Sequence, residues 1–209
     1  MENCKAGKLN IAEVYVAKIP LEVGDEPICP KAREEEIFAC GNERVRRQKF
    51  YAWKLLERAL RSSLGMEMKD LAFTKNSCGK WETPSCYFSI SHSKNAVAVA
   101  VSDAPIGVDV EGWNGVKISA LERALMPAER EEYLSVLPEN QTEFLLQKWT
   151  GKEAVFKVLG GKRFQPTKID GGAIGVQSRL IYLDGERYTL SVYTQSENVC
   201  WRILEENIK

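Results

Sequence analysis

Two acidic side chains on one face of a predicted strand are the first candidates for chemistry. Residues 106–111 read Ile-Gly-Val-Asp-Val-Glu. Alternate side chains of a strand point to opposite faces, so Asp109 and Glu111 point outward together while Val108 and Val110 face the core. Two negative charges this close are unfavourable unless a cation or a basic group lies between them. A hard cation such as magnesium prefers oxygen ligands of this kind, although an ordinary amphipathic edge strand is the commoner explanation of Asp-x-Glu alone.

A second candidate cluster lies about forty residues further on, in a predicted helix that contains Trp149-Thr-Gly-Lys-Glu-Ala-Val-Phe-Lys157. Glu153 shares a side with two aromatic residues, and Lys157 lies one turn beyond Glu153. A surface Glu–Lys pair, stabilising by a few tenths of a kcal/mol, explains the spacing equally well. The aromatic neighbours favour a partly buried carboxylate instead. Lys152 and Lys157 could each hold a phosphate as a point charge.

Three weaker signals precede these clusters. His92, between Ser91 and Ser93, is expected in a turn, where it is either an ordinary loop histidine or a donor to a phosphate oxygen, helped by backbone N–H groups. Lys80 follows a turn glycine, which is a common arrangement. Basic residues at positions 44–49 crowd the start of a predicted helix. Such a run is usually a solvated face, but cations there oppose the helix dipole and slightly favour an anion ligand.

The composition limits the function classes. The chain has 209 residues with 29 Lys plus Arg and 29 Asp plus Glu, so it lacks the basic excess of a general nucleic-acid binder. No apolar run predicts a signal peptide or a membrane span. The six cysteines form no C-x-x-C pair, and His92 is the single histidine, which disfavours a zinc or redox site. We therefore expect a cytoplasmic protein with reduced thiols and no nucleic-acid or membrane partner.

The periodicity predicts an α+β fold whose two halves, 1–104 and 105–209, each contain helix and strands. We expect Asn42 to cap a long helix that ends near Leu64, a helix from Pro127 to about Leu137, and a longer one from Glu139 to Leu159 that ends at two glycines. A turn at Asp184-Gly185 predicts a hairpin. Residues 87–111 are expected to form an antiparallel meander. The expected strands are 10–19, 87–91, 96–101, 106–111, 174–177, 179–183, 188–193 and 199–204.

The order of these segments resembles a known family. Gly79-Lys80, residues 88–93 (Phe-Ser-Ile-Ser-His-Ser), residues 107–111 (Gly-Val-Asp-Val-Glu) and the helix 149–157 follow one another as in the 4′-phosphopantetheinyl transferase superfamily. The length is similar to the class with two halves in one chain, which surfactin-synthetase activators typify. The resemblance covers roughly residues 44–164, and the last two elements in this order are specific together.

The resemblance implies a fold and an activity. The fold would be two similar α+β halves with antiparallel sheets forming a pseudo-dimer, with the active site at their junction. The protein would be a magnesium-dependent holo-[acyl-carrier-protein] synthase and a monomer. It would transfer the 4′-phosphopantetheine arm of coenzyme A to a serine of an apo acyl carrier protein or peptidyl carrier domain, and release adenosine 3′,5′-bisphosphate.

The resemblance also implies roles for individual residues. Asp109, Glu111 and Glu153 correspond to the magnesium ligands. Either Glu153 or Glu129 would take the serine proton, and Lys157 would stabilise charge on the leaving phosphate. The residues expected to contact coenzyme A are Arg47, Lys80, Ser91, His92, Lys152 and Lys157.

Two positions depart from the family pattern. Met126 replaces the usual serine before Glu129, and Trp81 replaces the frequent proline after Lys80. Neither belongs to the metal set, so they bear on loop shape and carrier preference. A non-catalytic regulator that binds coenzyme A or a carrier protein on the same scaffold is the alternative. A third reading, a magnesium enzyme acting on another nucleotide, would not be a P-loop enzyme because G-x-x-x-x-G-K-[ST] is absent.

Overall fold

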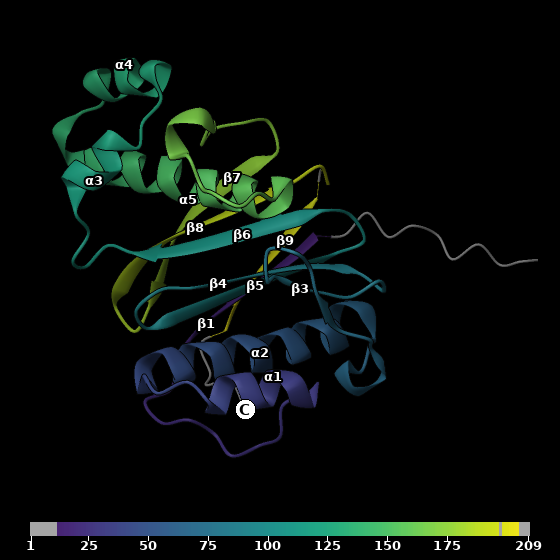
Figure 1. The fold of residues 1–209 in the computed structure, drawn as a ribbon. Coiled ribbons are helices and arrows are strands. Elements are labelled where there is room, and N and C mark those ends of the chain that lie inside the picture. The colour runs from purple at the N-terminus through teal and green to yellow at the C-terminus, as the bar shows by residue number, and fades with distance from the viewer. Residues whose placement is uncertain (1–11, 197, 205–209) are drawn as a thin grey trace, which may run out of the picture.

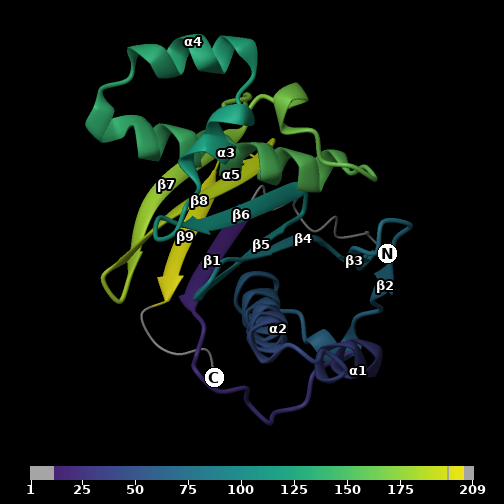
Figure 2. The same ribbon diagram turned by 60° about the vertical axis from the view of Figure 1, so that its left-hand side comes forward.

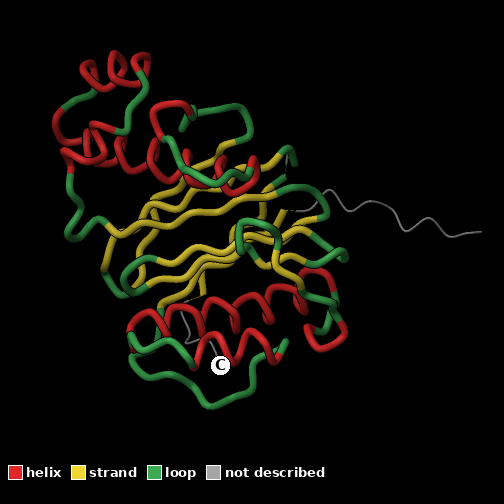
Figure 3. The backbone as a smooth tube through the Cα atoms, viewed as in Figure 1, coloured by secondary structure: helices red, strands yellow, loops and turns green. Residues whose placement is uncertain are grey.

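Two stacked β-sheets covered by helices on both outer faces make up the protein (Figures 1 and 3). The structure is a computed structural model that describes residues 12–196 and 198–204. The first sheet has the strand order β4-β5-β1-β9, and the second has the order β6-β8-β7. The helix α2 packs on the first sheet with α1 beside it, and α5 packs on the second sheet with α3 and α4 against it, as the rotated view also shows (Figure 2).

The first sheet combines strands from both ends of the chain. Its neighbours pair antiparallel except for β1 and β9, which are parallel. β5 alternates alanine and valine, so its alanines face the second sheet while its valines face α2. The bounds are β1 Ala12–Lys18, β4 Tyr87–His92, β5 Ala96–Ser102 and β9 Val199–Leu204.

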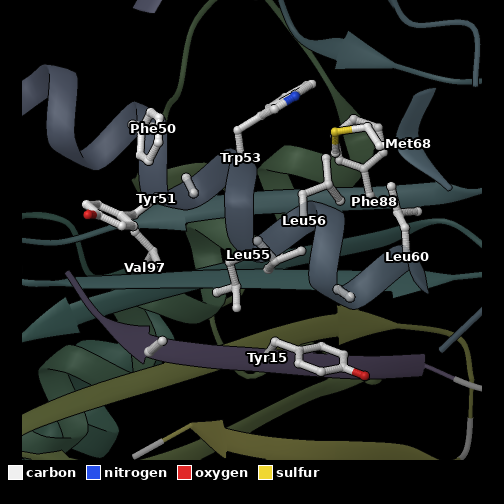
Figure 4. Close-up of a cluster of buried hydrophobic side chains, with 14 of the residues drawn as sticks. Tyr15, Phe50, Tyr51, Trp53, Leu55, Leu56, Leu60, Met68, Phe88 and Val97 are labelled. Carbon is white, nitrogen blue, oxygen red and sulfur yellow. The ribbon is translucent and has the colours of Figure 1, made fainter. Parts of the chain in front are cut away.

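The helix α2, Glu43–Leu64, supplies most of the core on the first sheet. The Asn42 side chain accepts a hydrogen bond from the Val45 N–H at 3.1 Å, and Gly65 ends the helix with a φ of 62°. Large side chains such as Trp53 and Leu56 belong to one buried cluster with Tyr15 of β1 and Phe88 of β4 (Figure 4). The shorter α1, Lys31–Phe38, lies beside α2.

The second sheet packs its apolar face against the first. Val108 and Val110 of β6 and Leu190 of β8 share a buried core with the alanines of β5. Asp184 and Gly185, both with positive φ, form the tight turn of the β7–β8 hairpin. The bounds are β6 Ile106–Gly112, β7 Val176–Leu183 and β8 Glu186–Thr194.

The helix α5, Gln141–Leu159, lies directly on β6. A Cβ atom added at Gly107 would come within 2.0 Å of the Ala154 carbonyl oxygen, so only glycine permits this approach. α3 (Ile118–Arg123) packs on α5, and α4 (Pro127–Ser135) follows it in the chain. The remaining elements are β2 Thr74–Lys75, β3 Trp81–Glu82, and the 3₁₀ turns Met68–Asp70, Pro138–Asn140 and Pro166–Lys168.

The predicted α+β class with antiparallel sheets is confirmed, but two pairings differ from expectation. β6 does not continue a meander with β5; it crosses to the second sheet and pairs with β8. Two strands were expected at 174–177 and 179–183, but the structure has one strand there, β7, which runs from Val176 to Leu183. A period of two identifies which face is buried but carries no information about the neighbouring strand.

Several predictions stay predictions. The first sheet contains β9 from the end of the chain, so its strands come from both predicted halves, and the boundary at 104/105 and the pseudo-dimer stay untested. Residues 10 and 11 of the first expected strand, and Cys4, lie outside the described residues. Within the described ranges, no helix has the length and apolar character needed to cross a membrane.

Candidate active site

Asp109 lies at the centre of the site, between β6 and α5. We expected it to point to solvent, but it is only 3% exposed because α5 covers that face of β6. The Lys157 ammonium group donates to the Val108 carbonyl oxygen and to Asp109 Oδ1, both at 2.8 Å. Lys157 therefore bonds to β6, and Glu153 forms no ion pair with any described residue.

One oxygen of Asp109 is saturated and the other is not. Oδ1 accepts hydrogen bonds from Lys157 and from the Ser91 hydroxyl, the latter at 2.6 Å. Oδ2 is buried and has no hydrogen-bond partner among the described residues. A buried carboxylate oxygen without a partner is unfavourable, so this position favours a ligand.

Two further carboxylates add negative charge beside Asp109. Burial, with the nearby Asp109 charge, raises the pKa of Glu111 from 4.5 to about 7. Burial and the charges of Asp109 and Glu111 likewise raise the pKa of Glu153 to about 7, although Lys157 opposes this shift. One ammonium group thus faces three carboxyl groups, which leaves an excess of negative charge.

This donor set fits a hard divalent cation. The unpartnered Asp109 Oδ2 and the two carboxyls with raised pKa are oxygen donors that a cation would stabilise. In the described part of the chain, no three or more Asp, Glu, His or Cys side chains lie close enough together to hold a metal ion by themselves. Magnesium often keeps waters and substrate phosphates as ligands, so a partial protein set suits it.

Two cavities meet at His92, at the end of β4. One of about 480 Å³ is lined by Lys80, Lys157 and Trp81, and the other of about 420 Å³ by Glu111. His92 lines both cavities. Partial burial of the imidazole, together with the charge of Lys157, lowers the pKa of His92. A neutral imidazole can still donate one hydrogen bond.

The Lys80 side chain lies against the last turn of α5. Its ammonium group donates to the Lys157 carbonyl oxygen at 3.1 Å, and burial lowers the pKa of Lys80. The turn before it is fixed by Asn76, whose side-chain oxygen accepts from the Cys78 and Lys80 N–H groups. Lys80 and Lys157 therefore reach the same cavity from the two sides of the molecule.

Lys152 and Glu129 lie apart from this group. Lys152 is fully buried, and its ammonium group donates to Glu129 Oε2 and to the Pro166 and Ile169 carbonyl oxygens. Glu129 also accepts from the Met126 and Gly171 N–H groups. Lys152 was predicted to face a phosphate together with Lys157. It points elsewhere because the two side chains leave α5 in different directions.

Arg47 and Ser91 are also engaged with the protein itself. The Arg47 guanidinium donates to the Leu21 carbonyl oxygen, and Arg47 lines neither of the two cavities that meet at His92. The Ser91 hydroxyl, predicted to contact coenzyme A, is bonded to Asp109 and to the Val110 N–H.

Other cations line the cavities in places that the sequence did not indicate. Arg33 and Lys49 line the larger cavity, and Arg44, Lys94 and Arg187 line the smaller one. No pattern predicted α1, which carries Arg33. Arg44 and Lys49 lie in the basic run that was treated as a weak signal.

Trp81, which departs from the family pattern, has its own partners. Its indole N–H donates to Glu36 at 3.2 Å, and its ring meets the edge of Trp53 at 5.8 Å between centroids. Through these two contacts, Trp81 connects the turn that carries Lys80 to α1 and α2.

Comparison with known proteins agrees with the predicted family. The family model "4'-phosphopantetheinyl transferase superfamily" matches residues 105–207. The 4'-phosphopantetheinyl transferase AcpT of Salmonella typhi is 31% identical over 147 residues, which are 65% of this chain and 71% of that protein. The chain belongs to the 4′-phosphopantetheinyl transferase superfamily.

Relatives of the predicted class match as well. The 4'-phosphopantetheinyl transferase psf-1 of Bacillus pumilus is 30% identical over 109 residues, 51% of this chain and 47% of that protein. The 4'-phosphopantetheinyl transferase gsp of Aneurinibacillus migulanus is 25% identical over 140 residues, 66% of this chain and 59% of that protein. The chain thus spans about half the length of several such relatives. The family resemblance is confirmed.

Proposed function

We propose that the protein is a magnesium-dependent 4′-phosphopantetheinyl transferase. It would transfer the phosphopantetheine arm of coenzyme A to a serine of an apo acyl carrier protein or peptidyl carrier domain, with adenosine 3′,5′-bisphosphate as the leaving group. The observation that carries the proposal is Asp109 Oδ2, a buried carboxylate oxygen without a hydrogen-bond partner among the described residues, next to Lys157, which lines one of the two cation-rich cavities that meet at His92.

Asp109, Glu111 and Glu153 would hold the magnesium ion. Bound there, magnesium supplies positive charge for a pyrophosphate. Lys80 and Lys157 would hold the phosphate oxygens, since their ammonium groups reach the same cavity. Catalysis of phosphoryl transfer rests mainly on positioning and on stabilising charge.

Glu153 is our candidate for the group that takes the serine proton. The serine oxygen forms a bond to phosphorus, the bond from phosphorus to the adenosine bisphosphate oxygen breaks, and the proton passes to a carboxylate. Glu129 is 4% exposed and already accepts three hydrogen bonds, so we give it a structural role.

The partners of the protein would be coenzyme A and a carrier protein. We further propose that it acts as a monomer in the cytoplasm, without nucleic-acid or membrane partners.

A transfer assay tests the function. The protein is incubated with coenzyme A, magnesium and a panel of apo carrier proteins, and carrier mass is followed. We expect one carrier to gain the mass of one phosphopantetheine arm. No gain with any carrier, from folded protein, would contradict the proposal. Coenzyme A binding without any transfer would support a regulator instead.

Two variants test the site itself. Asp109→Ala and Glu153→Gln are expected to abolish transfer while the circular dichroism spectrum is unchanged, because each removes a carboxylate from the site. Glu131→Gln, at an exposed position of α4, is the matched control and is expected to transfer normally. Normal transfer by Asp109→Ala would remove the metal argument.

A further inference from the structure

The two sheets are joined at the site by serine side chains instead of backbone carbonyl groups. β4 is the edge strand of the first sheet and β6 is the edge strand of the second, and they lie side by side (Figure 1). Ser89 and Ser91 of β4, and Ser93 directly after it, are spaced two residues apart. The hydroxyl oxygen of each accepts a hydrogen bond from a backbone N–H group of β6. These bonds are Val108 N–H to Ser89 at 3.1 Å, Val110 N–H to Ser91 at 3.4 Å and Gly112 N–H to Ser93 at 3.0 Å.

Two of the three hydroxyl groups have a second task. The Ser91 hydroxyl donates its hydrogen to Asp109 Oδ1 at 2.6 Å, and the Ser93 hydroxyl donates to Glu111 Oε2 at 3.1 Å. A hydroxyl has one hydrogen to donate and can accept as well, so both tasks are compatible. The Ser89 hydroxyl lies opposite Gly107, where no carboxylate exists.

We propose that Ser91 and Ser93 are positioning residues for the two cation-binding carboxylates. Each hydroxyl holds one carboxylate oxygen against β4, so that the other oxygen is turned toward the cation. For Asp109, the oxygen that remains is the buried Oδ2 without a partner. The inference rests on the proposed function, and it gives Ser91 a role in holding Asp109 in place of contact with coenzyme A.

Ser89 provides the matched control within the same ladder. It is 1% exposed, comes from the same strand and accepts the same kind of N–H, but it touches no carboxylate. Removing its hydroxyl therefore weakens the junction of the sheets without releasing a cation ligand. Ser91→Ala and Ser93→Ala remove a junction bond and a carboxylate partner together.

The experiment measures metal binding directly. Free Mn²⁺ is followed by electron paramagnetic resonance as the full-length protein is titrated, with and without coenzyme A, and thermal unfolding is followed by circular dichroism. Losing a hydrogen-bond partner of a metal ligand typically lowers metal affinity about 10–100-fold, which is the loss expected for Ser91→Ala and Ser93→Ala. Ser89→Ala is expected to unfold at a lower temperature with Mn²⁺ affinity unchanged. Ser93→Thr, which keeps the hydroxyl, should retain the affinity of the unmodified protein.

Clear results would overturn the proposal. Unchanged Mn²⁺ affinity in Ser91→Ala and Ser93→Ala, or an equal loss in Ser89→Ala, contradicts it. Ser93 is half-buried, so its variant keeps the test open if Ser91→Ala does not fold. A protein that binds Mn²⁺ in this way but transfers nothing to any carrier refutes the proposed function alone. Absence of Mn²⁺ binding to the unmodified protein refutes both.

Discussion

The helix α5 carries two lysines five residues apart that meet carboxylates in contrasting ways. Lys152 and Glu129 form a closed group, since the lysine donates three hydrogen bonds and the glutamate accepts three. Lys157 and Asp109 form an open one, because Asp109 Oδ2 has no hydrogen-bond partner in the described part of the chain and Lys157 lines a cavity. The polar atoms of the closed pair are all hydrogen-bonded within the protein, so this pair stabilises the fold. In the open pair, Asp109 Oδ2 is available to bind a ligand.

Both groups depend on close backbone contact that glycine allows. At the open site, Gly107 lets α5 touch β6 at Ala154. At the closed pair, a Cβ atom added at Gly171 would come within 2.2 Å of the Lys148 carbonyl oxygen. Close packing is thus common to both, and the difference between them lies in whether the polar atoms are saturated.

The largest expected effect is on the closed pair. Lys152→Met leaves Glu129 buried without its cation, which typically costs about 3–5 kcal/mol in the free energy of unfolding. Urea unfolding measures it. Lys148→Met is the control on the same helix; it breaks a pair with the exposed Glu132, and exposed pairs contribute about 0–1 kcal/mol.

Comparable losses in the two variants would contradict the contrast between buried and exposed pairs. The double variant Lys152→Met with Glu129→Met removes both charges, and we expect it to recover much of the lost stability.

The next effect is on the open pair and concerns the transfer rate. Lys157→Met removes a cation that would hold phosphate charge, and a lost preorganised donor of this kind costs about 10²–10³-fold in rate. The carrier-mass assay measures the rate, and urea unfolding checks the fold. A variant that transfers normally but unfolds like Lys152→Met would show that Lys157 is structural.

Alanine substitutions at the two glycines distinguish the open site from the closed pair, with a smaller expected loss in the free energy of unfolding. Gly107→Ala and Gly171→Ala each force backbone apart, and overpacking typically costs about 1–3 kcal/mol. Only Gly107→Ala displaces α5 at the open site, so only it is expected to lower Mn²⁺ affinity as well as stability. Equal loss of Mn²⁺ affinity in both variants would mean that the two ends of α5 move together.

The last prediction concerns the pH dependence of the open group. Glu111 and Glu153 have a pKa of about 7 in the folded protein against 4.5 ordinarily, so their contribution to stability is full below about pH 4.5 and is lost as the pH rises through about 7. Magnesium competes with those protons, so its stabilisation should increase over the same interval. Thermal unfolding with and without magnesium measures this, and Glu111→Gln with Glu153→Gln should abolish it.

Local sequence signals predicted the elements that carry the site. Asn42 caps α2 as predicted, and the helix ends at Leu64 as expected. The alternation in residues 106–111 placed Asp109 and Glu111 on one face, and helical spacing placed Glu153 one turn before Lys157. The order of these segments identified the family. Which residues bind the cation and coenzyme A stays a prediction.

Local sequence signals did not predict the contacts between distant segments. From the sequence, Lys152 and Lys157 were predicted to have the same role, because both are lysines in one helix near one glutamate. Their difference arises because residues 166–171 close over Lys152 while a cavity opens beside Lys157. Ser93 had a detectable signal, its spacing of two from Ser91, but nothing in that spacing reveals that β6 lies opposite.

By itself, the sequence determined the helices α2, α4 and α5, most strands, the shared face of Asp109 and Glu111, and the family. The tertiary structure decided that β6 leaves β5 for β8, that β9 returns to β1, that α5 buries Asp109, and that serine hydroxyl groups join the sheets. The physical reason is that periodicity and capping are local, so they fix which side of an element is apolar. Which partner covers that side depends on the packing of the whole chain.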